Sequence, residues 1–132
     1  MDKNTPIAEF MTPVPQTVGS AQTITFARKL MDKHGIRHLP VLHGGKLYGV
    51  VSDRDLGVIA GLNEVDPDET TVEEAMTQDV YTVPKDASLF AVLQEMLAHK
   101  YGSTLVVEGG KVIGIFTTYD ALGVLVEHFP GA

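Results

Sequence analysis

Two short stretches of the chain end in the same arrangement of polar residues. Residues 49–55 read GVVSDRD and residues 114–120 read GIFTTYD. In each stretch a hydroxyl residue, Ser52 or Thr117, follows an apolar run, and an aspartate, Asp55 or Asp120, stands three places later. Such a hydroxyl can cap a helix, and the aspartate then lies in the first turn beside free backbone N–H groups.

The same residues could instead bind a ligand. A carboxylate has two oxygens and can accept hydrogen bonds from both hydroxyls of a vicinal diol, such as that of ribose. Each hydrogen bond to an ionised group contributes roughly 1.5–3 kcal/mol. Capping and ligand binding therefore stand as alternatives for Ser52, Asp55, Thr117 and Asp120.

The two stretches belong to an internal repeat. When the chain is shifted by 65 residues, residues 5–57 align with 70–122 without a gap, and fourteen of the 53 aligned positions are identical. Self-similarity at a fixed offset indicates repeated structural units. We therefore predict two copies of one unit, at residues 5–62 and 70–128, with a linker at 63–69.

Each copy predicts the same order of elements. Thr5 is expected to cap a short helix that begins at Pro6, and Thr70 with Glu73 predicts a capping box in the second copy. An extended stretch follows at 17–18 and 82–83. Thr23 and Ser88 then precede residues with helical apolar spacing, and Gly35 is expected to end the first of these helices.

Two strands and a final helix complete each copy. Gly44-Gly45 and Gly109-Gly110 join β-rich runs, which indicates hairpins. The last helix should begin at Ser52 or Thr117. A β-α-β-β-α unit of this size leaves one apolar face of its sheet open. The predicted fold class is therefore α+β, with the two units packed through their sheets in pseudo-two-fold symmetry.

Composition narrows the class of protein. The chain has 132 residues, no cysteine and a net charge of −7, from 17 acidic and 10 basic residues. The absence of cysteine excludes disulfides and thiolate chemistry. The acidic balance disfavours nucleic acid as a partner. No apolar run is long enough to span a bilayer, and no signal peptide is evident, so we expect a cytoplasmic protein.

The repeat also identifies a family resemblance. The doubled unit, the GVVSDRD and GIFTTYD endings and the stretch GIRHLPVL at residues 35–42 together resemble the cystathionine beta-synthase (CBS) domain pair, or Bateman module. The resemblance covers roughly residues 5 to 128. It implies a free-standing regulatory module that binds AMP, ADP, ATP or S-adenosylmethionine in clefts between the two units. It also implies a flat homodimer of two such pairs.

The resemblance assigns ligand-binding roles to residues of the first copy. Asp55 is expected to bind ribose, with Ser52 beside it. Ile36 and Leu39 would lie against adenine, whereas Arg37, His38 and Arg54 would face phosphate or the cleft. Pro40 and Thr17 complete the expected set, listed in full as Thr17, Ile36, Arg37, His38, Leu39, Pro40, Ser52, Arg54 and Asp55. A solvated strand end is the alternative for Arg37, and ordinary strand propensity is the alternative for Thr17.

The second copy departs from this pattern. Asp120, Thr117 and Thr82 match the first copy, but residues 100–105 read KYGSTL where the first copy has GIRHLP. Tyr101 could stack on a base and Lys100 could meet a phosphate. The alternative is that this second site is degenerate and only structural.

Other chemistries find less support. His34 and His38 have helical metal-ligand spacing, but the expected helix end at Gly35 removes that geometry. No nucleophile elbow, P-loop or dinucleotide fingerprint occurs, and we predict no enzyme and no required cofactor. A ligand-free dimerisation scaffold is the alternative function, and a nucleic-acid-binding CBS pair is a third. The regulated partner is not specified by the sequence.

Overall fold

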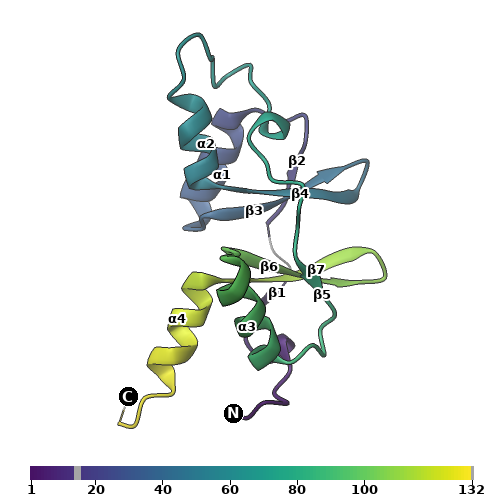
Figure 1. Cartoon of the computed structure of the whole chain (residues 1–132). Helices are drawn as coiled ribbons and strands as arrows, with labels where there is room; N and C mark the ends of the chain where they lie inside the picture. The colour runs from purple at the N-terminus through teal and green to yellow at the C-terminus, as the bar shows by residue number, and fades with distance from the viewer. Residues whose placement is uncertain (14–15, 132) are drawn as a thin grey trace. The chain divides into compact units, whose positions relative to one another are not determined.

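The computed structural model describes residues 1–13 and 16–131, and these residues form two compact units. Unit 1 comprises the described residues of 1–15 together with those of 81–132, and unit 2 comprises residues 16–80. Each is an α+β unit, as predicted (Figure 1). No helix in the described ranges is both long and apolar enough to cross a membrane.

Unit 2 contains one sheet and two helices. Its elements are β2 (Val18–Gly19), α1 (Ile24–His34), β3 (His38–His43), β4 (Lys46–Ser52), α2 (Asp53–Ala60) and the single-turn 3₁₀ helix η2 (Val72–Glu74). The strand order is β2-β3-β4, with β2 parallel to β3 and β3 antiparallel to β4. Gly44 and Gly45 turn the hairpin with φ of 58° and 79°, values that glycine adopts without steric cost.

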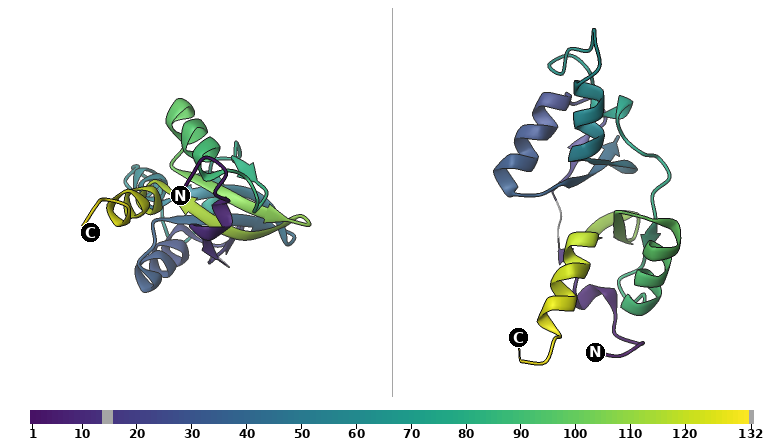
Figure 2. Two further views of the ribbon diagram at one scale, coloured as in Figure 1. Left: turned by 90° about the horizontal axis from the view of Figure 1, so that it is seen from below. Right: turned by 60° about the vertical axis from the view of Figure 1, so that its left-hand side comes forward.

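Unit 1 repeats this plan with one additional strand. Its elements are η1 (Ile7–Glu9), β1 (Thr12–Pro13), β5 (Thr82–Val83), α3 (Leu89–His99), β6 (Ser103–Glu108), β7 (Lys111–Thr117) and α4 (Thr118–Glu127). The strand order is β1-β7-β6-β5. The hairpin between β6 and β7 turns at Gly109 and Gly110, again with positive φ. Figure 2 shows the helices of the unit on one side of its sheet.

The compact units do not coincide with the sequence repeats, because the lead-in segments are exchanged. Ile7 belongs to the first repeat, yet its N–H donates to the carbonyl oxygen of Ala87 at 2.7 Å and its side chain is fully buried in the core of unit 1. Thr77 belongs to the second repeat, yet it forms two backbone hydrogen bonds with Val50, at 2.9 and 2.8 Å, in unit 2. Each repeat therefore completes the sheet and core of the other.

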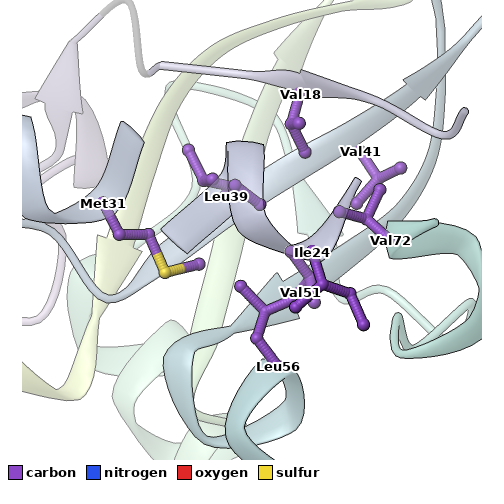
Figure 3. Close-up of a cluster of buried hydrophobic side chains, with 9 residues drawn as sticks. Val18, Ile24, Met31, Leu39, Val41, Val51, Leu56 and Val72 are labelled. Carbon is purple, nitrogen blue, oxygen red and sulfur yellow. The ribbon is translucent and has the colours of Figure 1, made fainter. Parts of the chain in front are cut away.

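Each core lies between the helices and one face of the sheet. In unit 2 the buried side chains come from β2, α1, β3, β4, α2 and η2 (Figure 3), and the labelled ones are Val18, Ile24, Met31, Leu39, Val41, Val51, Leu56 and Val72. Burying side chains of this size stabilises a fold by roughly 1.5–3 kcal/mol each. Because Leu39 of β3 and Val51 of β4 belong to this core, the core holds in place the strand ends on which the candidate site lies.

The helix ends show which local predictions were correct. Thr23 and Ser88 cap α1 and α3, accepting hydrogen bonds from the N–H groups of Phe26 and Ala91, and Gly35 ends α1 with φ of 63°. The predicted cap at Thr5 was wrong: its hydroxyl accepts from the N–H of Asp2, and η1 has no side-chain cap.

The capping box predicted at Thr70 and Glu73 was also wrong. The residue before η2 is Thr71, which makes no cap hydrogen bond. Glu73 instead accepts a hydrogen bond from the Tyr48 hydroxyl at 3.1 Å.

Candidate functional site

Strand pairing in unit 2 brings most of the first-copy candidates to one end of the sheet. His38 at the start of β3 is paired with Ser52 at the end of β4, and the N–H of Asp53 donates to the carbonyl oxygen of Arg37 at 2.9 Å. Because β3 and β4 are antiparallel, residues far apart in sequence meet here. The GIRHLP stretch and the Ser52–Asp55 motif therefore share one edge.

Ser52 and Asp55 form a reciprocal capping box at the start of α2. The N–H of Ser52 donates to Oδ2 of Asp55 at 3.0 Å, and the N–H of Asp55 donates to Oγ of Ser52 at 3.0 Å. Among the described residues, Oδ1 of Asp55 accepts no hydrogen bond, and the side chain is half-buried. The capping interpretation is thus correct, and it leaves one carboxylate oxygen available to a ligand.

Thr117 and Asp120 repeat this geometry at the start of α4. The N–H of Thr117 donates to Oδ2 of Asp120 at 2.8 Å, the Thr117 hydroxyl donates to the same oxygen at 3.1 Å, and the N–H of Asp120 donates to Oγ1 of Thr117 at 3.2 Å. Within the described chain, Oδ1 of Asp120 accepts no hydrogen bond either. The two copies therefore present equivalent carboxylate oxygens.

The glycine that opens each motif has a packing role that sequence reasoning missed. A Cβ at Gly49 would lie 2.7 Å from the carbonyl oxygen of Thr77 and 2.8 Å from Sδ of Met76, and a Cβ at Gly114 would collide with the side chain of Met11. The identity of these glycines and methionines in both copies was the available signal. Glycine lets the exchanged lead-in segment approach the strand that ends in the motif.

The basic candidates Arg37, His38 and Arg54 lie in unit 2, and both arginines are exposed. Arg37 forms a long ion pair with Asp53, with 4.0 Å between Nη1 and Oδ2, and its side chain is 78% exposed. Arg54 is exposed in the first turn of α2, and His38 is half-buried. An exposed guanidinium at this edge can bind a phosphate through two hydrogen bonds.

The apolar candidates differ in accessibility. Ile36 is half-buried beside the core, whereas Leu39 is fully buried within it and Pro40 is also buried. Leu39 and Val41 share one strand face because side chains alternate along a strand, and this face is the core face. Because side chains alternate along a strand, the burial of Leu39 in the core could have been predicted from the sequence.

The threonine candidates lie at the start of short strands. Thr82 is paired with Leu105, and Thr17 directly precedes Val18, which is paired with Val41 in the parallel register. Both threonines are exposed while the following valines are buried. Their hydroxyls are therefore accessible at the strand edge.

Unit 1 replaces the cationic edge by an aromatic stack. Tyr101 stacks on Tyr81 and on His99, each with 5.1 Å between ring centroids, and His99 also contacts Oε2 of Glu95 at 3.1 Å. Burial raises the pKa of the Tyr81 hydroxyl, and the Glu95 carboxylate adds to that shift. The exposed Lys100 precedes the stack at the end of α3.

In residues 1–13 and 16–131 no three His, Asp or Glu side chains converge. An apolar hollow of about 530 Å³ lies in unit 1 and is lined partly by α4, but none of its lining residues is a candidate from the sequence.

The chain is similar to known proteins in both sequence and structure. The sequence is 33% identical over 115 residues to Hypoxic response protein 1 of Mycobacterium tuberculosis, covering 84% of this chain and 78% of that protein. The crystal structure of Hypoxic Response Protein I, with two coordinated zinc ions, superimposes with a TM-score of 0.78 and 27% identity, covering 96% of this chain and all of that chain.

A second solved structure is relevant to the strand-end motifs. It is a CBS domain pair in complex with 5′-methylthioadenosine and S-adenosyl-L-methionine, with a TM-score of 0.84, 28% identity and coverage of 95% of this chain and 98% of that chain. The sequence model of the CBS domain matches residues 7–56 and 72–127, which include both capping boxes. With two matched copies over most of its length, the chain belongs to the CBS domain family as a CBS domain pair.

Proposed function

We propose that the chain is a regulatory module that binds an adenosine-containing ligand: AMP, ADP, ATP or S-adenosylmethionine. The observation that carries the proposal is the pair of equivalent capping boxes, each of which leaves Oδ1 of its aspartate without a hydrogen bond among the described residues. Asp55 and Asp120 would use this oxygen to accept the ribose hydroxyls. The relative solved with two adenosyl compounds supports this chemistry.

The proposal gives the other edge residues distinct roles. Ser52 and Thr117 hold the aspartates in position, while Thr17, Thr82 and Ile36 would contact the base. Arg37, His38 and Arg54 would bind phosphate in the site built on unit 2. We propose that the units pair through their sheets, so that these edges line clefts between them, and that ligand occupancy favours one arrangement of the units. A ligand shifts such an equilibrium only through different affinities for its states.

Unit 1 offers a less cationic edge, which bears on ligand choice. Gly102 and Tyr119 stand at the positions of Arg37 and Arg54, so Lys100 is the nearby basic candidate for a phosphate. We therefore expect a nucleotide to favour the edge of unit 2. Leu39 and Pro40 would support this edge from within rather than contact the ligand, because both are buried.

The test is thermal unfolding of the purified chain with AMP, ADP, ATP, GMP, NAD and S-adenosylmethionine. A ligand present at one hundred times its dissociation constant raises the free energy of unfolding by about 2.7 kcal/mol. We expect a clear rise in melting temperature with at least one adenosine compound and none with GMP. No shift with any compound would contradict the proposal and favour the ligand-free scaffold.

A conservative variant separates binding from capping. In Asp55→Asn the amide oxygen can still accept from the N–H of Ser52, so the cap and the apo stability are retained, but the carboxylate that accepts the ribose hydroxyls is lost. We expect the ligand-induced shift to fall while the apo melting temperature stays within a few degrees. Asp53→Asn, in the same helical turn, removes the ion-pair partner of Arg37 but no proposed ribose acceptor, so it should not reduce the ligand-induced shift. If the double variant Asp55→Asn/Asp120→Asn kept the full ligand-induced shift in melting temperature, both aspartates would act only as helix caps.

A further inference from the structure

The chain contains five methionines and no cysteine, so its reversible sulfur chemistry is confined to thioether groups. Four of the methionines form two matched pairs in the repeat, Met11 with Met76 and Met31 with Met96. Met31 and Met96 are 3% and 5% exposed and lie within the two cores. Met11 and Met76 are half-buried and pack against the edges of those cores. An oxidant in solution therefore reaches the Met11–Met76 pair more readily than the Met31–Met96 pair.

Each half-buried methionine covers a glycine of a long strand. A Cβ placed on Gly49 would lie 2.8 Å from Sδ of Met76, and Sδ of Met11 is the nearest atom to the same position on Gly114. In both units the sulfur is therefore the methionine atom packed most closely against the strand. Because protein interiors are close-packed, an atom added to this sulfur has to displace one of the two segments.

The lead-in segments that carry these methionines are attached by short backbone pairings. Met11 directly precedes β1, a strand of two residues at the edge of the sheet of unit 1. Met76 directly precedes Thr77, which forms an isolated bridge with Val50 of β4. Such pairings supply few hydrogen bonds, so the packing of the methionine contributes a large share of the attachment. The strands to which the segments attach, β7 and β4, end in the two capping boxes.

Oxidation of the sulfur would weaken this packing. Methionine sulfoxide carries a polar S=O group in place of an apolar thioether, and such a group disrupts an apolar contact. The N–H groups of Met76, Thr77 and Val50 already donate to carbonyl oxygens, at 3.0, 2.8 and 2.9 Å. They can bond to a sulfoxide oxygen only if a hydrogen bond of the lead-in segment breaks. Since a buried polar group without a hydrogen bond is costly, the sulfoxide favours separation of the segment from the strand.

We propose that Met11 and Met76 are modification sites at which a hydroperoxide forms methionine sulfoxide, and that this oxidation releases the lead-in segments from β7 and β4. In this step the O–O bond of the peroxide breaks, one oxygen bonds to sulfur, and the other leaves as water or an alcohol. The sulfur loses two electrons and the peroxide gains them. A dithiol reverses the step, because its oxidation to a disulfide returns the two electrons and the oxygen leaves as water. The proposal goes beyond ligand binding and does not depend on it.

The first test is a time course of hydrogen peroxide treatment of the whole folded chain, followed by peptide mass mapping. We expect the initial rate at which Met11 and Met76 gain one oxygen to be about tenfold higher than that of the buried Met31 and Met96. Met1, which is 67% exposed, gives the rate of an unprotected methionine. Equal initial rates at the two matched pairs would overturn the proposal.

The second test measures the effect of the modification on stability. We expect peroxide to lower the melting temperature of the wild-type chain by several degrees. It should leave that of Met11→Leu/Met76→Leu unchanged, because leucine is apolar, similar in volume to methionine and not oxidised by peroxide. Met31→Leu/Met96→Leu is the matched control and should remain as sensitive to peroxide as the wild-type chain. An equal loss of stability in Met11→Leu/Met76→Leu and in the wild-type chain would contradict the proposal.

Hydrogen exchange shows where the oxidised chain opens. The N–H groups of Val50 and Thr77 bond to each other's carbonyl oxygens, so both amides should exchange about tenfold faster after oxidation. The amides of Leu39 and Val51, which are paired between β3 and β4, should change least. Treatment with a methionine sulfoxide reductase should restore the original rates. Unchanged exchange at Val50 and Thr77, or an equal rise at all four amides, would show that oxidation does not release the lead-in segment.

Discussion

Unit 1 and unit 2 have the same fold, the same hairpins and the same capping boxes. They differ in how well the residues at matched positions suit the backbone conformation and the burial there. Gly35 and Lys100 end matched helices in the same left-handed conformation, with φ of 63° and 59°. Leu39 and Thr104 occupy matched positions and are both fully buried. In each case unit 2 has the residue that suits the environment and unit 1 does not. Unit 1 therefore carries local costs that unit 2 avoids.

A side-chain pair shows a second kind of difference. Ser20 and His43 are joined by a 2.8 Å hydrogen bond in unit 2, and the matched Lys85 and Glu108 form a 3.0 Å salt bridge in unit 1. Both pairs tie the hairpin to the segment that follows the first strand. The position is fixed by the fold, whereas the chemistry of the bond is free to change. Exposed ion pairs contribute only about 0–1 kcal/mol, so this exchange costs little.

The largest expected effect concerns the glycines beneath the lead-in segments. Gly49→Ala should lower the free energy of unfolding by about 3 kcal/mol, and Gly114→Ala by about 1 kcal/mol. At position 49 the new Cβ meets the carbonyl oxygen of Thr77, whose backbone is held by two hydrogen bonds to Val50. At position 114 the three nearest atoms all belong to the flexible Met11 side chain. Urea unfolding measures both, and equal costs would contradict this asymmetry.

Much of the fold could be predicted because the constraints are local. Paired glycines, hydroxyl caps and apolar spacing each act within a few residues, and the repeat supplied every signal twice. The exchange of the lead-in segments could not be predicted, since Ile7 and Val72 match each other in type and nothing in the repeat specifies which sheet each joins. Thr5 failed as a cap because its hydroxyl bonds to the preceding turn at Asp2.

Part of the candidate site could also be predicted from the sequence. Antiparallel pairing of two strands places Arg37 and His38 beside the end of the second strand, so the meeting of the two motifs follows from the hairpin. The aromatic stack of Tyr81, Tyr101 and His99 could not be foreseen, because Tyr81 comes from a different segment than the other two rings. In this stack the Tyr101 ring packs against two protein rings, whereas the sequence suggested that it could stack on the base of a ligand.

A smaller effect on the free energy of unfolding is expected when a buried hydroxyl in the core of unit 1 is replaced by a methyl group. Oγ1 of Thr104 is buried and has no hydrogen-bond partner in the described part of the chain. A buried hydroxyl without a partner costs roughly 1–3 kcal/mol, so Thr104→Val should raise the free energy of unfolding by about 1 kcal/mol. The inverse change in unit 2, Leu39→Thr, should destabilise the protein. A destabilised Thr104→Val variant would mean that the hydroxyl is satisfied in solution.

The helix ends give a smaller shift still. Lys100 holds a left-handed conformation that glycine adopts at lower cost. Lys100→Gly should therefore stabilise the protein by about 0.5 kcal/mol, and Gly35→Lys should destabilise it by about 1 kcal/mol. Calorimetric melting of both variants measures the difference. If Lys100→Gly lowered the melting temperature, the Lys100 side chain would have to make a stabilising contact that outweighs the backbone cost.

The smallest expected effect on stability is at Tyr48, whose aligned residue in unit 1 is Ile113. The hydrogen bond to the Glu73 carboxylate, together with its charge, raises the pKa of the Tyr48 hydroxyl above its ordinary value of 10.0. Because the folded pKa is the higher one, this contribution to stability is present below pH 10 and is lost as the pH rises through the folded pKa. NMR titration should find the Tyr48 midpoint above the ordinary tyrosine value of 10.0, and Glu73→Gln should lower it. An unchanged midpoint in Glu73→Gln would show that the bond between η2 and the hairpin does not form in solution.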